Sequence, residues 1–311
     1  MAYVIAHSDA SYNQHGEDPL IHTVGTYICT DEDWREFRDD WKSYIHSHGV
    51  DNFHTTDFFR AQREIRKGRR DRLGSKDFYK NWNEADFDPF LDGLHRIINA
   101  KRKDENYRME AFIGSHVKAD FLATLPDELK NEPGCTSHYI WNVANNMESI
   151  AQWADWNGYK DPIHYVFATG DRPEGNNLEM WFHQCWTNPL FKQRFRLSTD
   201  YTQERYRRKS AADEPAIQAA DLASWEFNQA SIKTAREGRL DIKLLRRELI
   251  NLCRGARHNG KLWTAKEFIP SFAGMVAFKK EHGAAIISRH ILFDQQDLPD
   301  KGIAVRREKN D

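Results

Sequence analysis

The stretch IHYVFATGD, residues 163–171, decides the fold class of this sequence. Its apolar and β-prone residues predict a strand buried on both faces, which is typical of a central strand in a sheet covered by helices. The strand is expected to end at Asp171, directly after Gly170. In an open α/β sheet, ligand sites form beside the carboxyl ends of strands, so Asp171 is a candidate site residue.

The other strands are predicted from short β-prone runs, at residues 3–10, 21–30, 109–117 and 196–206. Helical patterns are found at residues 31–49, the end of 76–102, 136–159, 177–188 and from 215 onward. The turn-like link between the first two strands favours an antiparallel hairpin, and the later strands alternate with helices. This order predicts an α/β fold with a mixed sheet flanked by helices.

A helical and basic insertion is predicted between the second and third strands, over about residues 31–105. Within it, DNFHTTDF at 51–58 fits either a strand or a turn. Residues 60–74 lack apolar periodicity and are expected to form an exposed loop or a frayed helix. One domain is expected over residues 1–240, with residues 241–311 as a C-terminal extension packed on the same domain.

The composition limits the class of protein. The chain has 311 residues, of which 40% are hydrophobic, so it can bury a sizeable core. Its formal net charge of -2 means that any contact with nucleic acid would have to come from local basic patches. The N-terminus turns polar too early for a signal peptide, and no apolar run approaches the ~18 residues that span a bilayer. We therefore expect a cytoplasmic protein.

The cysteines are far apart and none forms a C-x-x-C pair, which excludes a zinc site built from two such pairs. A mixed histidine and cysteine site is not excluded by the spacing. Reduced, mostly buried thiols are expected at all four positions: Cys29, Cys135, Cys185 and Cys253.

Four carboxylates stand out by position. Asp9 ends the first predicted strand and Asp171 ends the fourth, so the two would meet if these strands are parallel neighbours. Glu148 lies in the helix after the third strand, and Asp221 lies in the last core helix. Both helical acids could reach the same place from one side. The sequence therefore predicts a site that contains Asp9, Glu148, Asp171 and Asp221.

Asp221 is the most unusual of these acids. In PAIQAADLASWEF, residues 215–227, it shares an apolar helix face with Ile217 and Trp225. The structural alternative is that Asp221 caps a loop amide or pairs with an arginine. Glu174, in the turn-like stretch GDRPEGNN, is an alternative acid for the site.

A divalent metal ion would explain a group of buried acids, because neighbouring carboxylates repel each other when ionised. Oxygen ligands suit Mg²⁺ or Mn²⁺, and Asp9, Asp171 and Asp221 are the predicted ligands. Two such ions about 3.5–4 Å apart can activate a water and stabilise a leaving oxygen in phosphodiester cleavage.

Four segments of the chain resemble a bacterial family, the domain-of-unknown-function family numbered thirty-eight hundred. SDAS is similar to the family's Asp-Glu-Ser-Gly strand end, FHTTDF to its Phe-His-x-x-Asp segment, and YVFATGD to its aspartate-ending strand. IQAADLASWE is similar to its Leu-Gln-x-Ala-Asp-Leu helix and is the most specific of the four. The resemblance covers roughly residues 3–230.

The family resembles the ribonuclease H-like superfamily, which places acids on the first strand, the first core helix, the fourth strand and the last helix. Carried over to this sequence, the resemblance implies Asp9, Glu148, Asp171 and Asp221 as the acids and nuclease chemistry as the activity. Ala10 stands where the family usually has a glutamate beside its first aspartate.

Further candidate residues bind substrate or support the acids. His54 and Asp57 could bind a phosphate or a metal, or could lock a turn, and Gln218 could orient a ligand carboxylate. Two basic runs could follow a phosphate backbone or could simply be solvated surface. The first contains Arg60, Arg63, Arg66, Lys67, Arg69, Arg70 and Arg72, and the second contains Arg205, Arg207, Arg208 and Lys209.

The sequence therefore predicts one of two functions. The first is a metal-dependent nuclease or related phosphoryl-transfer enzyme that acts on nucleic acid with Mg²⁺ or Mn²⁺. The second is a non-catalytic module that binds nucleic acid or a protein in a bacterial defence or mobile-element system. Cleavage that is lost in Asp221→Asn favours the first, and salt-sensitive binding without metal favours the second.

Overall fold

A six-stranded mixed sheet forms the centre of the molecule in a computed structural model, which describes residues 4–12, 20–75, 77–132, 134–168, 177–197, 206–209, 214–238, 246–253 and 258–282. The strands are β1 Val4–Tyr12, β2 Ile21–Thr30, β3 Glu110–Val117, β4 Ile163–Ala168, β5 Tyr206–Lys209 and β6 His258–Trp263. The expected α/β fold with a mixed sheet is confirmed.

The helices fall into two groups along the chain. The first group is α1 Asp31–Ser47, α2 Thr55–Arg66, η1 Arg70–Arg72, η2 Phe78–Asn81 and α3 Glu84–Ile98. The second group is α4 Lys118–Thr124, α5 Asp127–Lys130, α6 His138–Trp156, α7 Asn177–Thr187, α8 Pro189–Arg194, α9 Pro215–Glu237, α10 Arg247–Cys253 and α11 Ala265–His282. No helix within these described ranges is long and apolar enough to cross a membrane.

The strand order is β5-β4-β1-β2-β3-β6. β2 runs antiparallel to both β1 and β3, and the register pairs Tyr12 with His22, so the predicted hairpin is confirmed. β4 lies beside β1 and runs parallel to it, with Ser8 opposite Phe167. The condition under which Asp9 and Asp171 were predicted to meet, parallel neighbouring strands, is therefore fulfilled.

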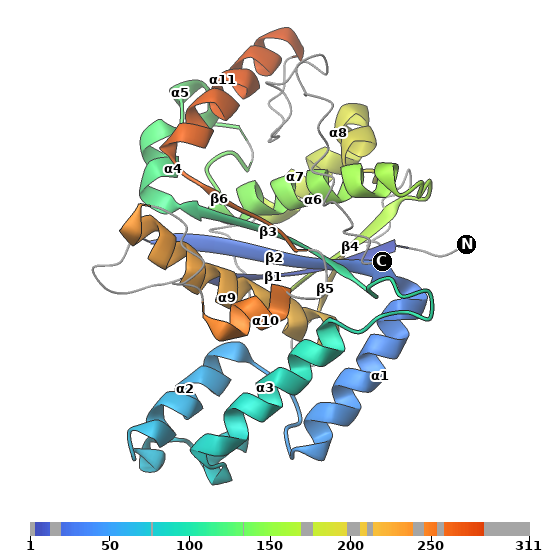
Figure 1. Ribbon diagram of the computed structural model, residues 1–311. Helices are drawn as coiled ribbons and strands as arrows, with labels where there is room; N and C mark the ends of the chain where they lie inside the picture. The colour runs from blue at the N-terminus through green and yellow to red at the C-terminus, as the bar shows by residue number, and fades with distance from the viewer. Residues whose placement is uncertain are drawn as a thin grey trace, which may run out of the picture.

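Helices cover both faces of the sheet (Figure 1). α6 lies on one face, with α4 and α11 beyond one end of it, and α9 lies on the other. α1, α2 and α3 form a further layer on the side of α9 that faces away from the sheet, at the bottom of the view. One buried core lies between the sheet and α6, where Trp141 and Ile150 pack. A second core joins the sheet, α9 and the α1–α3 layer, where Phe37 and Phe90 pack.

The segment from 51 to 66 differs from its prediction. Residues 55–66 form α2, where a strand or turn followed by a loop or frayed helix was expected. The reason is an aromatic cluster that only the folded chain assembles: buried Phe58 packs against Tyr79, Phe87 and Phe90. The helix is stabilised by these distant contacts more than by its own pattern.

The C-terminal part of the chain also differs in detail. The fifth strand starts at Tyr206, the last residue of its predicted range, and residues 198–205 lie outside the described part of the chain. The sequence did not predict β6, which extends the sheet beside β3. Its HNGKLW sequence has little β-strand pattern, and Gly260 is needed because a Cβ there would lie 2.4 Å from the ring of Phe227.

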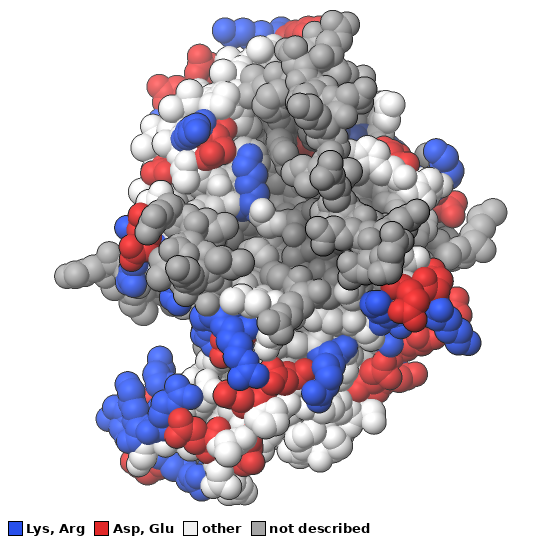
Figure 2. All heavy atoms as spheres, viewed as in Figure 1, with Lys and Arg blue, Asp and Glu red and all other residues white. Residues whose placement is uncertain are grey.

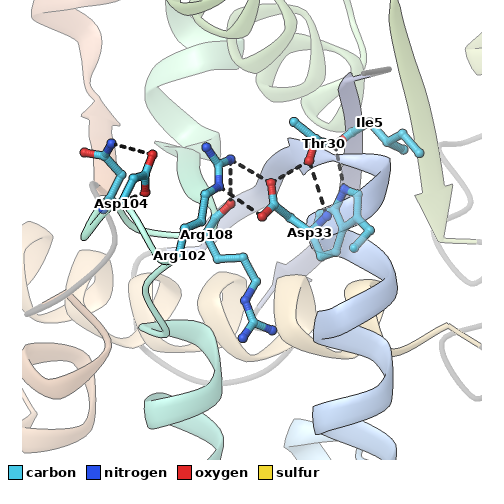
Figure 3. Close-up of polar contacts among 8 residues, drawn as sticks. Ile5, Thr30, Asp33, Arg102, Asp104 and Arg108 are labelled. Atoms are coloured by element: carbon cyan, nitrogen blue, oxygen red, sulfur yellow. Dashed lines mark hydrogen bonds and ion pairs between the residues drawn. The ribbon is translucent and has the colours of Figure 1, made fainter. Parts of the chain in front are cut away.

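A partly buried ion pair joins α1 to the connection before β3 (Figure 3). Thr30 caps α1 and donates its hydroxyl to Asp33 Oδ2 at 2.5 Å. Arg102 donates to both oxygens of Asp33, at 3.0 and 2.7 Å. Asp33 therefore holds the start of α1, and with it the α1–α3 layer, against the main sheet.

We expect Asp33→Ala to lower the free energy of unfolding by about 2 kcal/mol, because it leaves the Arg102 guanidinium without its bidentate partner. Asp31→Ala is the matched control in the same helical turn, since its pair with Arg35 is exposed and 3.4 Å long. The control should change stability by at most about 0.5 kcal/mol in urea unfolding. Equal losses in the two variants would contradict this role of Asp33.

Candidate functional site

Helix α9 carries the residues on which the candidate site is built. It begins with Pro215 in the first turn, contains several alanines, and is capped after Glu237 by Gly238, whose φ of 68° is the left-handed conformation typical of a helix end. Almost every residue of its first half is buried, including Gln218, Asp221 and Ser224. Each of these polar residues has a partner in another element.

Ser224 ties α9 to the sheet. Its hydroxyl accepts from the backbone N–H of Gly25 at 2.7 Å and donates to the carbonyl of Asp9 at 2.8 Å. The hydroxyl thus bridges β1 and β2 at the position where Asp9 stands opposite Gly25. A Cβ on Gly25 would lie 2.6 Å from the Ser224 hydroxyl, so only glycine permits this approach.

Gln218 and Asp221 bind the α1–α2 region. Gln218 Oε1 accepts from the indole N–H of Trp41 at 2.7 Å and from the backbone N–H of Phe53 at 3.1 Å. Asp221 Oδ2 accepts from the backbone N–H of Thr55 at 2.9 Å, at the start of α2. A carboxylate at this point satisfies an otherwise unpaired N–H and interacts favourably with the helix dipole. The predicted structural alternative for Asp221, capping an amide, is thus present.

His54 connects the FHTTDF segment with the IQAADLASWE helix. Its Nδ1 lies 3.2 Å from Asp57 Oδ2, and its Nε2 lies 4.0 Å from Asp221 Oδ2. The His54 side chain is 49% exposed, whereas that of Asp221 is 9% exposed. Burial raises the pKa of Asp221, and the charge of His54 and the hydrogen bonds of Thr55 act against that rise. We call His54, Asp57 and Asp221 the His54 site.

Three more residues surround the His54 site. The Arg60 guanidinium lies 3.1 Å from Asp57 and 3.4 Å from Asp77. The hydroxyl of Tyr79 is buried and has no hydrogen-bond partner among the described residues. Burial, followed by the charges of Asp57, Asp77 and Asp221, raises the pKa of Tyr79. The site therefore contains more negative than positive charge.

Asp9 lies on the α9 side of the sheet. The hydroxyl of its neighbour Ser8 contacts Thr26 at 2.9 Å, and Asn146 of α6 donates to the same Thr26 hydroxyl. Ser8 therefore faces α6, and Asp9, the next residue in the strand, faces the opposite side. One Asp9 oxygen accepts from the backbone N–H of Ala10 at 2.8 Å.

Glu148 lies on the other side of the sheet, in α6. It is 4% exposed and paired with the guanidinium of Arg194 in α8. Arg194 compensates the charge of Glu148, as an arginine can do without a metal ion.

Several predicted site residues lie outside the described part of the chain, namely Asp171, Glu174 and Arg205. For Arg207 only its place in β5 is described. Among the described residues, no group of three or more histidine, cysteine, aspartate or glutamate side chains could hold a metal ion. The structure brings Asp221 together with His54 and Asp57, and it separates Glu148 from Asp9 by the thickness of the sheet.

The first basic run forms the end of α2 and the η1 turn. Figure 2 shows Lys and Arg gathered over this end of α2, at the lower left of the view. Some of these residues have acidic partners, such as Arg66 with Glu84 at 2.7 Å and Arg69 with Glu64 at 3.0 Å. Lys67 and Arg72 are exposed, and the described residues provide no ion pair for either.

A histidine cluster that the sequence did not reveal lies on the α6 side. His22, His116 and His138 come from β2, β3 and the start of α6, and their rings stack at centroid distances of 5.0 to 6.4 Å. Asn142 lies among them. The alternation of side chains along β2 and β3 was the one feature of the sequence that pointed to the cluster, because it places His22 and His116 on the α6 side of the sheet.

The hydrogen bonds of the cluster fix its proton positions. Asn142 donates from Nδ2 to the carbonyl of His22, so its Oδ1 must accept from His116 Nδ1. In the neutral ring, His116 Nε2 then accepts from His138 Nδ1 at 2.7 Å. Burial and the charge of His138 lower the pKa of His116 to about 3, and burial lowers that of His138 to about 4.

Comparison of the chain with known protein families, with curated proteins and with solved structures gives no match.

The histidine cluster makes the protein sensitive to acid. The unfolded chain binds protons on histidine near pH 6.5, but folded His116 binds one only near pH 3, so unfolding is favoured as the pH falls through this window. Between pH 6.5 and 4.5 we expect His116 alone to lower the free energy of unfolding by about 2 kcal/mol.

Urea unfolding at several pH values measures this effect. His116→Phe fills the same aromatic surroundings without a titrating group, so its stability should fall less steeply over this window than that of the wild type. Parallel pH profiles for the two proteins would show that His116 is not the source of the acid sensitivity.

Proposed function

We propose that this chain is a divalent-metal-dependent nuclease, or a related phosphoryl-transfer enzyme, with a ribonuclease H-like fold. The strand order β5-β4-β1-β2-β3, with β2 antiparallel to its neighbours, supports the proposed fold. In this proposal β6 and α11 are an addition at the β3 edge, and α1–α3 are an insertion between β2 and β3. The similarity of the chain's motifs to the family named above supports the same assignment.

The observation that carries the proposal is the register of β1 and β4. Ser8 pairs with Phe167, so Asp9 stands beside Ala168, the last residue of β4. Asp171 follows Ala168 by three residues, which can span at most about 11 Å. Asp9 is thus level with the carboxyl end of β4, and Asp171 follows that end in the sequence, so the proposal assigns both acids to the usual place for a site in such sheets.

The acids differ in how well they suit a divalent ion. Asp9 faces the α9 side of the sheet, and Asp221 is a buried carboxylate of α9 with no arginine partner among the described residues. Asp9, Asp171 and Asp221 are therefore the proposed ligands for Mg²⁺ or Mn²⁺. Glu148 fits this role less well, because Arg194 already compensates its charge. A bound divalent ion would lower the pKa of a water and stabilise the leaving oxygen.

The second candidate function is a module that binds nucleic acid without cleaving it. The exposed lysine and arginine residues at the end of α2 favour it, since such a surface attracts phosphates without need of a metal. The two functions are compatible, because a nuclease also needs a surface that holds its substrate.

The nuclease proposal is tested by incubating the protein with single- and double-stranded DNA, RNA and an RNA–DNA hybrid in Mg²⁺ or Mn²⁺. We expect cleavage of at least one substrate, and a loss of about 100-fold or more in Asp9→Asn and Asp171→Asn. Asp39→Asn, which changes an exposed acid of α1, is the control and should keep full activity. Cleavage that survives both site substitutions would contradict the proposed ligands.

The binding surface is tested without metal by fluorescence anisotropy of a labelled oligonucleotide. Replacing Lys67 and Arg72 together by glutamine should weaken binding several-fold and make it less salt-dependent, because two phosphate contacts are lost. Lys42→Gln, at an exposed position of α1, is the control for the loss of a surface charge elsewhere. An unchanged affinity in the double variant would place the phosphate contacts elsewhere.

A further inference from the structure

His54 and Asp221 face each other across the junction of α2 and α9. Their nearest atoms, His54 Nε2 and Asp221 Oδ2, are 4.0 Å apart, which is too long for a hydrogen bond. Two ligands of one metal ion, each with a bond of about 2.1 Å, stand about 3 to 3.5 Å apart. A shift of about half an ångström would bring this pair to that spacing.

Asp57 determines which nitrogen of His54 is available. A carboxylate only accepts hydrogen bonds, so the 3.2 Å contact with Asp57 Oδ2 places a proton on Nδ1. In the neutral ring Nε2 then carries a lone pair, and Asp221 Oδ2 lies 4.0 Å from this nitrogen. This is the arrangement in which metal-binding histidines are held by an outer carboxylate.

A positive charge between the His54 nitrogen and the Asp221 oxygen would stabilise both electron-rich atoms. A proton on Nε2 is one solution, but an imidazolium paired with a carboxylate draws it to about 2.7–2.9 Å. The observed separation is more than 1 Å longer. A metal ion between the two atoms is the other solution, and its ligand spacing of about 3 to 3.5 Å is nearer to the observed 4.0 Å.

The surroundings of the pair also favour a cation. The charges of Asp57, Asp77 and Asp221 all act on the buried Tyr79 hydroxyl, and Arg60 pairs with the first two of these acids. Asp221 is buried, and the buried hydroxyl of Tyr79 beside these acids has no hydrogen-bond partner among the described residues. An additional positive charge would compensate Asp221.

We propose that His54 and Asp221 bind one divalent transition-metal ion, with Asp57 holding the imidazole in the binding tautomer. This inference shares Asp221 with the proposed nuclease site and adds a nitrogen ligand to it. Water would fill the remaining positions around the ion. Because imidazole favours Mn²⁺ or Zn²⁺ over Mg²⁺, the site selects a transition metal where an all-oxygen site would not.

Calorimetric titration of the full chain with MnCl₂ and with MgCl₂ tests the site. We expect Mn²⁺ to bind at least 10-fold more tightly than Mg²⁺, and His54→Ala to weaken Mn²⁺ binding at least 10-fold. Asp57→Ala should weaken it about 10-fold through the loss of orientation. His48→Ala is the control, since His48 is exposed and bonded to its own helix at Tyr44.

The His54 side chain makes no capping hydrogen bond to the backbone of α2. We therefore expect His54→Ala to fold, with a circular dichroism spectrum like that of the wild type. Mn²⁺ binding that is unchanged in His54→Ala would overturn the proposal. A preference for Mg²⁺ over Mn²⁺ would also overturn the proposal. The same holds if the wild type fails to bind Mn²⁺ both in the absence and in the presence of an oligonucleotide.

The outcome is separable from that of the nuclease proposal. Mn²⁺ binding that depends on His54, without cleavage of any substrate, would support this site and contradict the nuclease. Metal-dependent cleavage that depends on Asp9, with Mn²⁺ binding unaffected by His54→Ala, would support the nuclease and overturn this site.

Discussion

The Ser224 hydroxyl lies between two backbone groups of neighbouring strands, accepting from Gly25 and donating to Asp9. Because both contacts are short and buried, they fix the position of α9 along β1. Gln218 and Asp221 are six and three residues earlier on α9, and they meet the chain at Phe53 and Thr55 only when the helix is in this register.

The same constraint connects the two cores of the protein. α9 has the sheet on one side and the α1–α3 layer on the other, so its surface carries few residues that face solvent. A polar residue on such a helix must have a partner in another element, or its burial is costly. This explains why Gln218, Asp221 and Ser224 each bind backbone groups, and why a carboxylate is present on an otherwise apolar helix.

The sequence predicted the features that depend on local pattern. The β1–β2 hairpin, the β4 strand and helix α6 follow from alternation and helical periodicity, and Asp221 was identified because it interrupts an apolar face. The sequence could not predict α2 or β6, because both are stabilised by partners far along the chain, such as Tyr79 for α2 and β3 for β6. The pairing of Glu148 with Arg194 of α8 and the histidine cluster likewise depend on contacts between distant segments.

The docking of α1–α3 on α9 has a consequence for synthesis on the ribosome. The last residue of α3 is Ile98, and α9 ends at Glu237, so more than a hundred residues must follow before the helix that covers this layer is complete. At about 5–20 residues per second, the delay is roughly 7 to 28 s. During that time the apolar side of α1–α3 has no α9 to pack against, and a nascent chain in this state is a natural client for chaperones.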